Sequence, residues 1–364
     1  MKCAILLTNL KLGGAERVAV NLANGLRNSG WDVDLVLVDA AGKLLREVDP
    51  QVRIVNLSAR RGRGAVLAFR RYAFANNPDA VLPIAYEMNL VAGLALIGMK
   101  SRPKLFMTVH NPLRRFAETS LAYRSVAMGL SRLLYPTAER VITVSRGIAD
   151  EMVARKWTIA DRIATIYNPV ISEDFAQFAN AACPANLRHD TSMPAIVNVG
   201  RLVPQKNHAL LLDAFKLVTE QRPAQLWIVG EGPLRTELEQ RIERLHLGES
   251  VQLLGHISNP FPIIRAADLF VLSSGHEGFG NVLVEAMALG TPIVSTDCPY
   301  GPREVLEGGK WGVLVPPGNA EALANAMLRV LGEGGTDARP RAQDFTVEHA
   351  VGDYVALMRS AMGD

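Results

Sequence analysis

The sequence contains little cysteine, and its cysteines follow no pattern typical of a disulfide framework or a metal site. Cys3, Cys183 and Cys298 are the only three among 364 residues, and no two of them form a CxxC pair. This spacing argues against a disulfide-stabilised secreted domain and against a cysteine-bound zinc ion. We therefore expect a reduced, cytoplasmic setting and no metal ligands among the cysteines.

Long hydrophobic runs are also lacking. The longest apolar helix candidate, Met88–Met99, contains Asn89. It is shorter than the roughly 18–20 residues that cross a bilayer. The N-terminal segment from Lys2 becomes polar by residue 8, so it resembles a first β-strand more than a signal peptide. We predict no transmembrane segment.

A strong excess of one charge is missing as well, but the balance hides an asymmetry. Residues 1–170 contain 24 Lys+Arg and 13 Asp+Glu (net +11), and residues 171–364 contain the other 15 and 23 (net −8), which sum to +3. A basic half suggests contact with an anionic surface. Phospholipid or a lipid-phosphate acceptor fits as well as nucleic acid does, and the plain alternative is that arginine is simply common here.

Two segments concentrate this basic character. Arg60–Phe74 and Leu113–Pro136 both mix arginines with leucine, valine and aromatic residues. Each is either a core-facing helix with a solvated basic face or a helix that lies on anionic lipid. The second reading predicts peripheral contact between the first half of the protein and an anionic membrane.

Length and patterning indicate two domains of the α/β class. The chain is 49% hydrophobic and 21% charged, as expected for globular domains, and its length exceeds one typical core. In both halves, apolar strand-like runs alternate with amphipathic segments, which indicates parallel sheets covered by helices on both faces. The predicted strands are residues 4–8, 33–38, 52–57, 80–84, 104–109, 141–144 and 163–166, then 195–199, 225–229, 251–254, 269–272, 292–295 and 312–315.

The predicted fold is two Rossmann-like, doubly wound parallel-sheet domains that face a central cleft. We place the first domain at residues 1–168, a proline-containing linker at 169–193 and the second domain at 194–345. Ligands of such sheets bind beyond the carboxyl ends of the strands, so the active site is expected in the cleft.

The most informative segment runs from Ser273 to Val294. A strand-like run is followed by Glu277, a glycine turn at 278–280 and a helix-like stretch at 281–289. A strand that ends in such a turn directs free N–H groups and a positive helix end at one point, which favours phosphate. Glu285 lies roughly two helical turns beyond Glu277, where it could accept hydrogen bonds from hydroxyl groups. Phosphate together with a polyol indicates a nucleotide sugar.

This Glu-x7-Glu segment resembles the motif of the retaining GT-B glycosyltransferases called family 4. The matching blocks follow the family order along nearly the whole chain. They are Gly13-Gly14-Ala15-Glu16-Arg17, Thr108-Val109-His110-Asn111, Gly200-Arg201 to Lys206-Asn207, and Val229-Gly230 to Arg235. The resemblance implies the GT-B fold, with a C-terminal helix at about 346–362 that crosses back onto the first domain. The chain is similar to members that extend lipid-linked oligosaccharides, polysaccharides or lipopolysaccharide cores.

The resemblance also implies roles for individual residues. Glu277 would contact the donor sugar near the reacting centre, and Glu285 would bind the ribose hydroxyls. The alternative for both is an ordinary solvated glutamate, but a charge inside a glycine turn has little structural use at Glu277. Arg201 and Lys206 would bind the departing diphosphate as it gains negative charge, although Arg and Lys are more often plain surface residues.

The turn itself is expected to assist the diphosphate without a metal ion. The N–H groups concerned belong to Gly278, Phe279, Gly280, Asn281 and Val282. The resemblance implies no cofactor and a metal-independent reaction. Asp32-Val-Asp34 precedes a strand instead of ending one, so we interpret it as a strand edge and not as a metal motif.

Weaker assignments complete the predicted site. His110 ends a predicted strand and would orient the donor sugar, although a strand-end histidine can also be a satisfied residue at a sheet edge. Gly14, with Glu16, would belong to the loop that closes over the donor phosphate. Gly230 would line the site in a turn that is mostly structural, since Arg235 stands at the third glycine position of a dinucleotide fingerprint. His256 and Ile257 would lie near the nucleobase, with uridine and guanosine both open.

We therefore expect a retaining glycosyltransferase that moves a sugar from a UDP- or GDP-sugar to a glycan or lipid-linked acceptor, without nucleic acid as a partner. It would act in the cytoplasm, at the inner face of the membrane if the basic half binds lipid. Two alternatives remain: a nucleotide-sugar epimerase of the same fold and a nucleotide-sugar-binding protein without catalysis. A new glycoside in the presence of an acceptor would separate the first reading from both.

Overall fold

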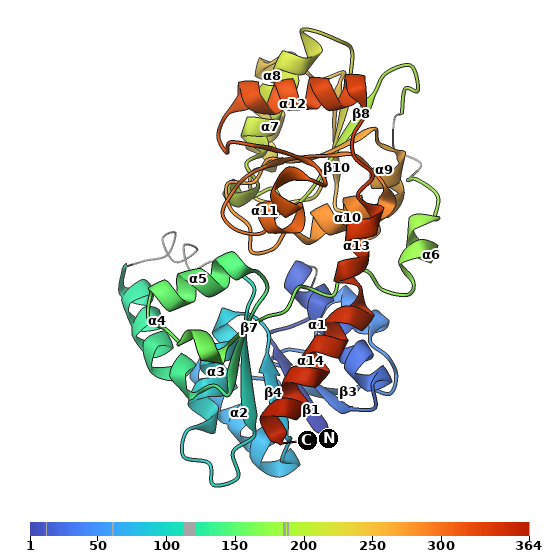
Figure 1. The fold of residues 1–364 in the computed structure, drawn as a ribbon. Helices are drawn as coiled ribbons and strands as arrows, with labels where there is room; N and C mark the ends of the chain where they lie inside the picture. The colour runs from blue at the N-terminus through green and yellow to red at the C-terminus, as the bar shows by residue number, and fades with distance from the viewer. Residues whose placement is uncertain (12, 60–61, 112–120, 185–186, 188, 364) are drawn as a thin grey trace. The chain divides into compact units, whose positions relative to one another are not determined.

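The computed structural model describes residues 1–11, 13–59, 62–111, 121–184, 187 and 189–363. The chain forms two compact units, which Figure 1 shows as ribbons. The first unit combines Met1–Val170 with Thr346–Asp364, and the second unit is Ile171–Phe345. Residues 171–193, which the sequence assigned to a linker, therefore belong to the second unit.

Among the described residues, the first unit contains a seven-stranded parallel sheet in the order β3-β2-β1-β4-β5-β6-β7. Its strands are β1 (Lys2–Leu7), β2 (Asp32–Leu37), β3 (Arg53–Asn56), β4 (Ala80–Pro83), β5 (Lys104–Val109), β6 (Arg140–Thr143) and β7 (Ile163–Thr165). The interior strand β1 is apolar beyond Lys2 and buried on both faces, as expected where helices cover both faces of a parallel sheet. Ile5 of β1 lies opposite Leu35 of β2 on one side and Leu82 of β4 on the other.

Helices cover this sheet in two layers. They are α1 (Gly14–Asn28), α2 (Arg63–Asn76), α3 (Tyr86–Leu96), α4 (Leu121–Leu134), α5 (Arg146–Ala154) and α14 (Val347–Met362), with short 3-10 turns at Lys43–Glu47, Tyr135–Thr137 and Ala160–Arg162. Helix α3 contacts both α2 and α4. Helix α1 packs its apolar face into the core on the other side, together with α14.

The C-terminal helix α14 belongs to the first unit although it follows the second in sequence (Figure 1). Thr346 caps it by accepting a hydrogen bond from the His349 N–H at 3.2 Å. Tyr354 and Met358 are buried in the core that α1 and β1 share. A Cβ atom at Gly25 of α1 would lie 2.5 Å from Val351, so a glycine is needed where the two helices cross.

Asp32 is the exposed first residue of β2, as expected for a strand edge, whereas Asp34 lies within the strand and is fully buried. The Asp34 carboxylate accepts hydrogen bonds from Arg53 and Tyr72 and forms an ion pair with Lys2 at 3.2 Å. Burial alone would raise the pKa of Asp34, but these partners outweigh it and lower the pKa. The buried charge is therefore fully paired.

The second unit contains, within the residues described, a six-stranded parallel sheet in the order β10-β9-β8-β11-β12-β13. Its strands are β8 (Ala195–Val199), β9 (Gln225–Val229), β10 (Val251–Gly255), β11 (Leu269–Leu272), β12 (Ile293–Thr296) and β13 (Val313–Val315). Its helices are α6 (Phe175–Ala179), α7 (His208–Thr219), α8 (Arg235–Arg244), α9 (Phe261–Ala266), α10 (Asn281–Leu289), α11 (Pro302–Val305), α12 (Ala320–Glu333) and α13 (Arg339–Ala342). Short 3-10 turns lie at Pro204–Lys206, Glu307–Gly309 and Gln343–Phe345. Helices α7, α8 and α12 share one apolar core with the sheet.

Candidate active site

The order of the second sheet reverses between β8 and β11, and both loops that follow these strands carry predicted site residues. In an open α/β sheet, the loops at such a reversal diverge and leave room for a ligand beyond the carboxyl ends. Gly200, Arg201 and Lys206 follow β8, whereas Ser274 and Glu277 follow β11. We refer to residues 200–207 as the Lys206 loop and to residues 275–280 as the Glu277 turn.

The structure brings Lys206 and Glu277 into direct contact. The Nζ atom of Lys206 lies 2.6 Å from Oε1 of Glu277, and Oγ of Ser274 donates to the same oxygen at 2.6 Å. The Glu277 side chain is 7% exposed and that of Lys206 is 19% exposed. Two residues that the sequence assigned to different parts of a substrate thus form one nearly buried ion pair.

Further hydrogen bonds tie the Lys206 loop to the Glu277 turn. The carbonyl of Gln205 accepts the Gly275 N–H at 2.9 Å, and the Gln205 side-chain amide donates to the His276 carbonyl at 3.0 Å. Ser273 donates to the carbonyl of Lys206 at 2.9 Å. Because backbone and side-chain bonds both cross between the loops, the ion pair is held at a fixed place.

The segment after β12 supports the Glu277 turn from the other side. Glu277 donates its N–H to the Pro299 carbonyl at 2.9 Å, and Tyr300 donates its N–H to the Glu277 carbonyl at 3.3 Å. A Cβ atom on Gly301, where φ is +86°, would lie 2.2 Å from the Phe279 carbonyl oxygen. Only glycine allows this approach, so the loop after β12 fixes the main chain of the turn.

Helix α10 begins directly after the turn, as the sequence predicts. Gly280 has φ of +92° and precedes the first helical residue, Asn281. The N–H groups at the start of a helix have no partner within it, so this end of α10 can receive an anion. Gly278, Phe279 and Val282 are buried, with the Phe279 ring against Phe345 at 5.5 Å, while Glu285 is half-buried on the same helix.

Glycines draw three neighbouring strand ends together beside the Lys206 loop. A Cβ atom on Gly230 would lie 1.9 Å from the Gly200 carbonyl oxygen, and one on Gly232 would lie 2.3 Å from that of Leu202. Gly230 in turn donates its N–H to the Gly255 carbonyl at 2.8 Å. Gly230 is therefore required for loop packing. Arg201 is exposed and forms no ion pair with any residue that the structure describes.

His256 and Ile257 follow β10, two strands away from β8. His256 is exposed and Ile257 is half-buried. Their loop begins at Gly255, which is joined to Gly230 and so to the Lys206 loop. The arrangement links them to the site through main-chain contacts, without a side-chain bond to Lys206 or Glu277 among the described residues.

The remaining predicted residues belong to the first unit. Gly14 is the first residue of α1 and is exposed. A Cβ atom on the preceding residue, Gly13, would lie 2.1 Å from the Glu16 carboxylate, so the Glu16 side chain folds back over the start of the helix. His110, at the carboxyl end of β5, is 8% exposed.

The tautomer of His110 follows from its neighbours. Thr108 donates its hydroxyl hydrogen to the Pro83 carbonyl at 2.7 Å, so its oxygen accepts from Nε2 of His110 at 3.1 Å. Burial lowers the pKa of His110 to about 4, against a smaller opposing effect of Asn168. The ring is therefore neutral near pH 7, with its proton on Nε2.

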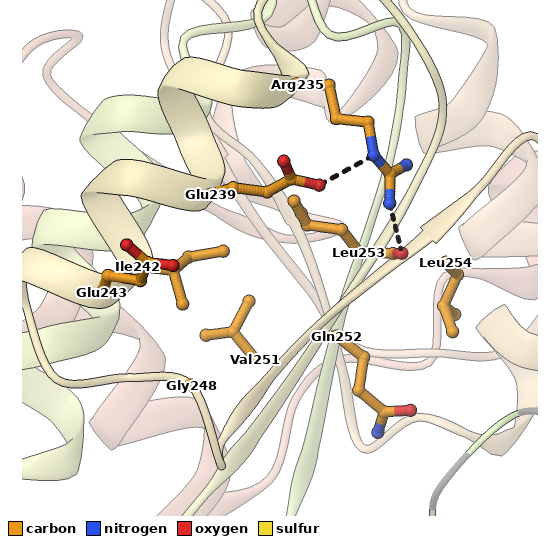
Figure 2. A pocket seen from close by; sticks show the side chains of 9 residues that line it. All are labelled: Arg235, Glu239, Ile242, Glu243, Gly248, Val251, Gln252, Leu253 and Leu254. Atoms are coloured by element: carbon orange, nitrogen blue, oxygen red, sulfur yellow. Dashed lines mark hydrogen bonds and ion pairs between the residues drawn. The ribbon is translucent and has the colours of Figure 1, made fainter.

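A cavity of about 450 Å³ lies elsewhere in the second unit, between α8 and the edge strand β10 (Figure 2). Arg235 stands at its margin, donating to Glu239 at 2.9 Å and to the Leu253 carbonyl at 3.5 Å. None of the predicted site residues lines it. Its only cation is already paired with protein groups, so we do not assign the donor to this cavity.

Sequence reasoning missed Ser274 and Gln205, which both contact the Glu277 turn or its carboxylate. Ser274 follows an apolar strand and stands three residues before Glu277. That position was a usable signal, because side chains at a strand end lie close to the first residues of the turn that follows. Gln205 gave no such signal, since its partner lies 71 residues away.

Comparison with known proteins identifies the family. The profile described as Glycosyltransferase Family 4 matches residues 12–174, and the profile described as Glycosyl transferases group 1 matches residues 193–333. The chain is 33% identical over 91% of its length, and 90% of the other protein, to an N-acetylgalactosamine-N,N'-diacetylbacillosaminyl-diphospho-undecaprenol 4-alpha-N-acetylgalactosaminyltransferase of Campylobacter jejuni. It is 26% identical over 94% of its length, and 92% of the other protein, to the lipopolysaccharide core biosynthesis glycosyltransferase LpsE of Rhizobium meliloti.

Solved structures agree on the architecture. The Anabaena protein HepE in complex with UDP and glucose has a TM-score of 0.79 and 23% identity, and the match covers 99% of this chain and 100% of HepE. Likeness at this identity concerns the fold, which is the GT-B arrangement of two Rossmann-like units. Together with the relative in Campylobacter jejuni, these matches establish that the chain is a glycosyltransferase and belongs to family 4 of the GT-B fold.

Proposed function

We propose that this glycosyltransferase retains the configuration of the transferred sugar and takes it from a UDP- or GDP-sugar. The observation that carries the proposal is the Lys206–Glu277 pair, which lies beside the start of α10 at the reversal of the second sheet. One cation, one carboxylate and a helix N-terminus at one point suit a substrate that combines a diphosphate with a sugar. The HepE complex contains UDP, which favours uridine as the base.

In this mechanism, an acceptor hydroxyl attacks the anomeric carbon on the side from which the nucleoside diphosphate departs. The bond to the acceptor oxygen forms as the bond to the β-phosphate oxygen breaks, and the hydroxyl proton passes to the departing phosphate. Lys206, Arg201 and the N–H groups of Gly278 to Val282 stabilise the negative charge that develops there. These groups take the place of a metal ion, so the reaction needs no cofactor.

The other residues position the donor. Glu277 binds the sugar next to the reacting carbon, and Glu285 accepts hydrogen bonds from the ribose. Neutral His110 acts as a hydrogen-bonding group, since it does not need to remove a proton when attack occurs on the same face. Gly14 approaches the phosphates, while Gly230, His256 and Ile257 form the surroundings of the nucleotide.

We further propose a glycan or lipid-linked acceptor in the synthesis of a cell-surface polysaccharide or lipopolysaccharide. The name of the Campylobacter jejuni relative includes diphospho-undecaprenol as part of its acceptor. The name of the Rhizobium meliloti relative includes lipopolysaccharide core biosynthesis. None of the helices in the described ranges has the length and apolarity needed to span a membrane. Because its lipid anchors such an acceptor in a bilayer, we propose that the enzyme meets it at the membrane surface.

Helix α2 offers a surface for that meeting. Phe74 is 82% exposed and Leu67 is 58% exposed, and the exposed Arg63 and Arg71 alternate with them along the same stripe. The helix contains no acidic residue. Exposed apolar side chains between arginines suit the interface of an anionic membrane. Arg60, Arg61, Arg114 and Arg115, which belong to the predicted basic segments, lie outside the described residues.

The proposed function is tested by proton NMR of the purified protein with a panel of UDP-, GDP- and ADP-sugars, in EDTA. Slow release of nucleoside diphosphate from one donor is expected, with the sugar first appearing in the anomeric configuration of the donor. Release that requires added metal would refute metal independence, and the opposite anomer would refute retention. Conversion into another nucleotide sugar without acceptor would mean an epimerase activity.

The same assay addresses the nucleotide contacts. Glu285→Ala is expected to weaken donor binding roughly tenfold, because it removes a charged acceptor from the ribose hydroxyls. The exposed Glu321 of α12 provides a matched control as Glu321→Ala, which should leave donor affinity unchanged. Unchanged affinity in the Glu285 variant would remove the ribose assignment.

A further inference from the structure

The two carboxylate oxygens of Glu277 have different surroundings. Oε1 accepts from Lys206 Nζ and from Ser274 Oγ, both at 2.6 Å. Oε2 forms no hydrogen bond or ion pair with the residues that the structure describes. A carboxylate oxygen with two strong charge-assisted bonds is fixed in place, and the fixed oxygen determines the orientation of the other.

Ser274 is held rigidly enough to impose this orientation. It is fully buried at the end of β11, and its carbonyl accepts the Thr296 hydroxyl of β12 at 2.7 Å. The next residue, Gly275, is bound to Gln205 through its N–H at 2.9 Å. The main chain on both sides of the Ser274 side chain is therefore anchored, and the hydroxyl has one nearby charged acceptor.

We propose that Ser274 is a positioning residue of the transfer reaction, which fixes Oε1 of Glu277 so that Oε2 faces the donor sugar. This inference rests on the proposed function of Glu277. The carboxylate then meets the sugar with one defined oxygen and in one rotamer. Ser274 itself touches no substrate.

Lys206 alone does not supply this orientation. Its ammonium is carried on a flexible four-carbon side chain and has three N–H donors. When a diphosphate binds, the ammonium is attracted to it and moves, and a carboxylate held only by Lys206 would follow. The Ser274 hydroxyl is tied to the sheet and does not move with the ligand. It keeps Glu277 in place while Lys206 shares its charge with the phosphate.

The test compares Ser274→Ala with Ser274→Thr, which keeps the hydroxyl. We expect kcat of Ser274→Ala to fall by roughly 10- to 100-fold, the loss of one hydrogen bond to a charged group. The donor Kd and the Tm should stay close to wild type, and Ser274→Thr should recover most of the rate. Ser295→Ala is the matched control, because Ser295 is equally buried in the same unit and donates only to the Thr296 carbonyl at 2.9 Å.

A double-mutant cycle shows whether Ser274 acts through Glu277. In a Glu277→Gln background, Ser274→Ala should cause little further loss of kcat. Full additivity would overturn the inference, and so would a Ser274→Ala variant as active as wild type while Glu277→Gln is inactive. If Glu277→Gln is itself fully active, the proposed role of Glu277 fails first, and the positioning inference fails with it.

A crystal structure of Ser274→Ala gives a readout that does not require turnover. The carboxylate of Glu277 should adopt another rotamer or share both oxygens with Lys206. An unchanged Glu277 side chain would contradict the inference even if no donor had been found. A changed Glu277 side chain would support the orienting contact even if the sugar were transferred with inversion, an outcome that would refute the proposed retention separately.

Discussion

At the scale of single residues, the second unit carries a buried histidine that the proposed chemistry does not use. His208 is the first residue of α7 and is fully buried, and neither ring nitrogen has a hydrogen-bond partner among the described residues. Burial, with a smaller effect of Lys206, lowers its pKa to about 4. The folded protein thus holds a neutral ring at a position where a charge would be costly.

This histidine should make stability depend on pH. The unfolded chain binds a proton at His208 near pH 6.5, while the folded chain does so only near pH 4. The unfolded state therefore holds more protons in this window, and the free energy of unfolding should fall as the pH drops from 6.5 to 4. The contribution is up to about 3 kcal/mol.

Urea unfolding at several pH values measures this effect. His208→Leu should flatten the decline between pH 6.5 and 4, leaving the part that comes from His110, whose pKa is also lowered to about 4. His349→Gln, at an exposed position of α14, controls for the loss of a histidine. An unchanged slope in the Leu variant would contradict the buried neutral state.

The residue scale is also where sequence reasoning reached its limit. The motifs placed Lys206 and Glu277 at strand ends, and the structure has both there. That these two side chains form an ion pair depends on the reversal between β8 and β11, which no local pattern encodes. The partners of Gln205 and the approach of Gly301 to Phe279 are likewise contacts between distant segments.

At the scale of elements, apolar runs predicted the strands well because the inner strands of both sheets are buried on both faces. The predicted run 104–109 is β5 and 269–272 is β11, and the helix expected at 281–289 is α10. Short helices such as α6, α11 and α13 were not predicted, since fewer than two turns leave no periodic pattern. The same reason explains why 171–193 resembled a linker.

Helix α2 should bind anionic lipid through its exposed stripe. Wild-type protein should sediment with vesicles that contain phosphatidylglycerol and not with neutral phosphatidylcholine vesicles. Phe74→Ser combined with Leu67→Ser should reduce binding to these vesicles several-fold. In the wild-type protein both apolar side chains move from water into the membrane interface, and serine does not gain this free energy.

The control for this experiment is Ile159→Ser, since Ile159 is 60% exposed in the same unit but lies outside α2. If the variant with both α2 substitutions still sediments with the anionic vesicles, α2 is not part of the membrane contact. Binding that 0.5 M salt abolishes would mean that the arginines contribute more than the apolar side chains.

At the scale of the whole molecule, the first unit depends on α14, which follows the second unit in the sequence. Met358 and Tyr354 of α14 complete the core beneath α1 and β1. Met358→Ala should lower the free energy of unfolding of this unit by roughly 2–5 kcal/mol. Arg359→Ala, at the exposed neighbouring position, should change it by less than about 0.5 kcal/mol.

Hydrogen exchange followed by mass spectrometry assigns the loss to a unit. Protection should fall in β1, α1 and β2, while the strands of the second unit keep theirs. Uniform loss of protection in both units would mean that they unfold as one body, contrary to their separate cores.

The return of α14 has a topological consequence. The second unit interrupts the first, and its two ends meet, because Ile171 donates its N–H to the Phe345 carbonyl at 3.1 Å. Residues 171–345 are therefore an insert with adjacent junctions, which can be exchanged between chains as a cassette without new connecting segments. If donor choice resides in this unit, it can be inherited or engineered separately from the choice of acceptor.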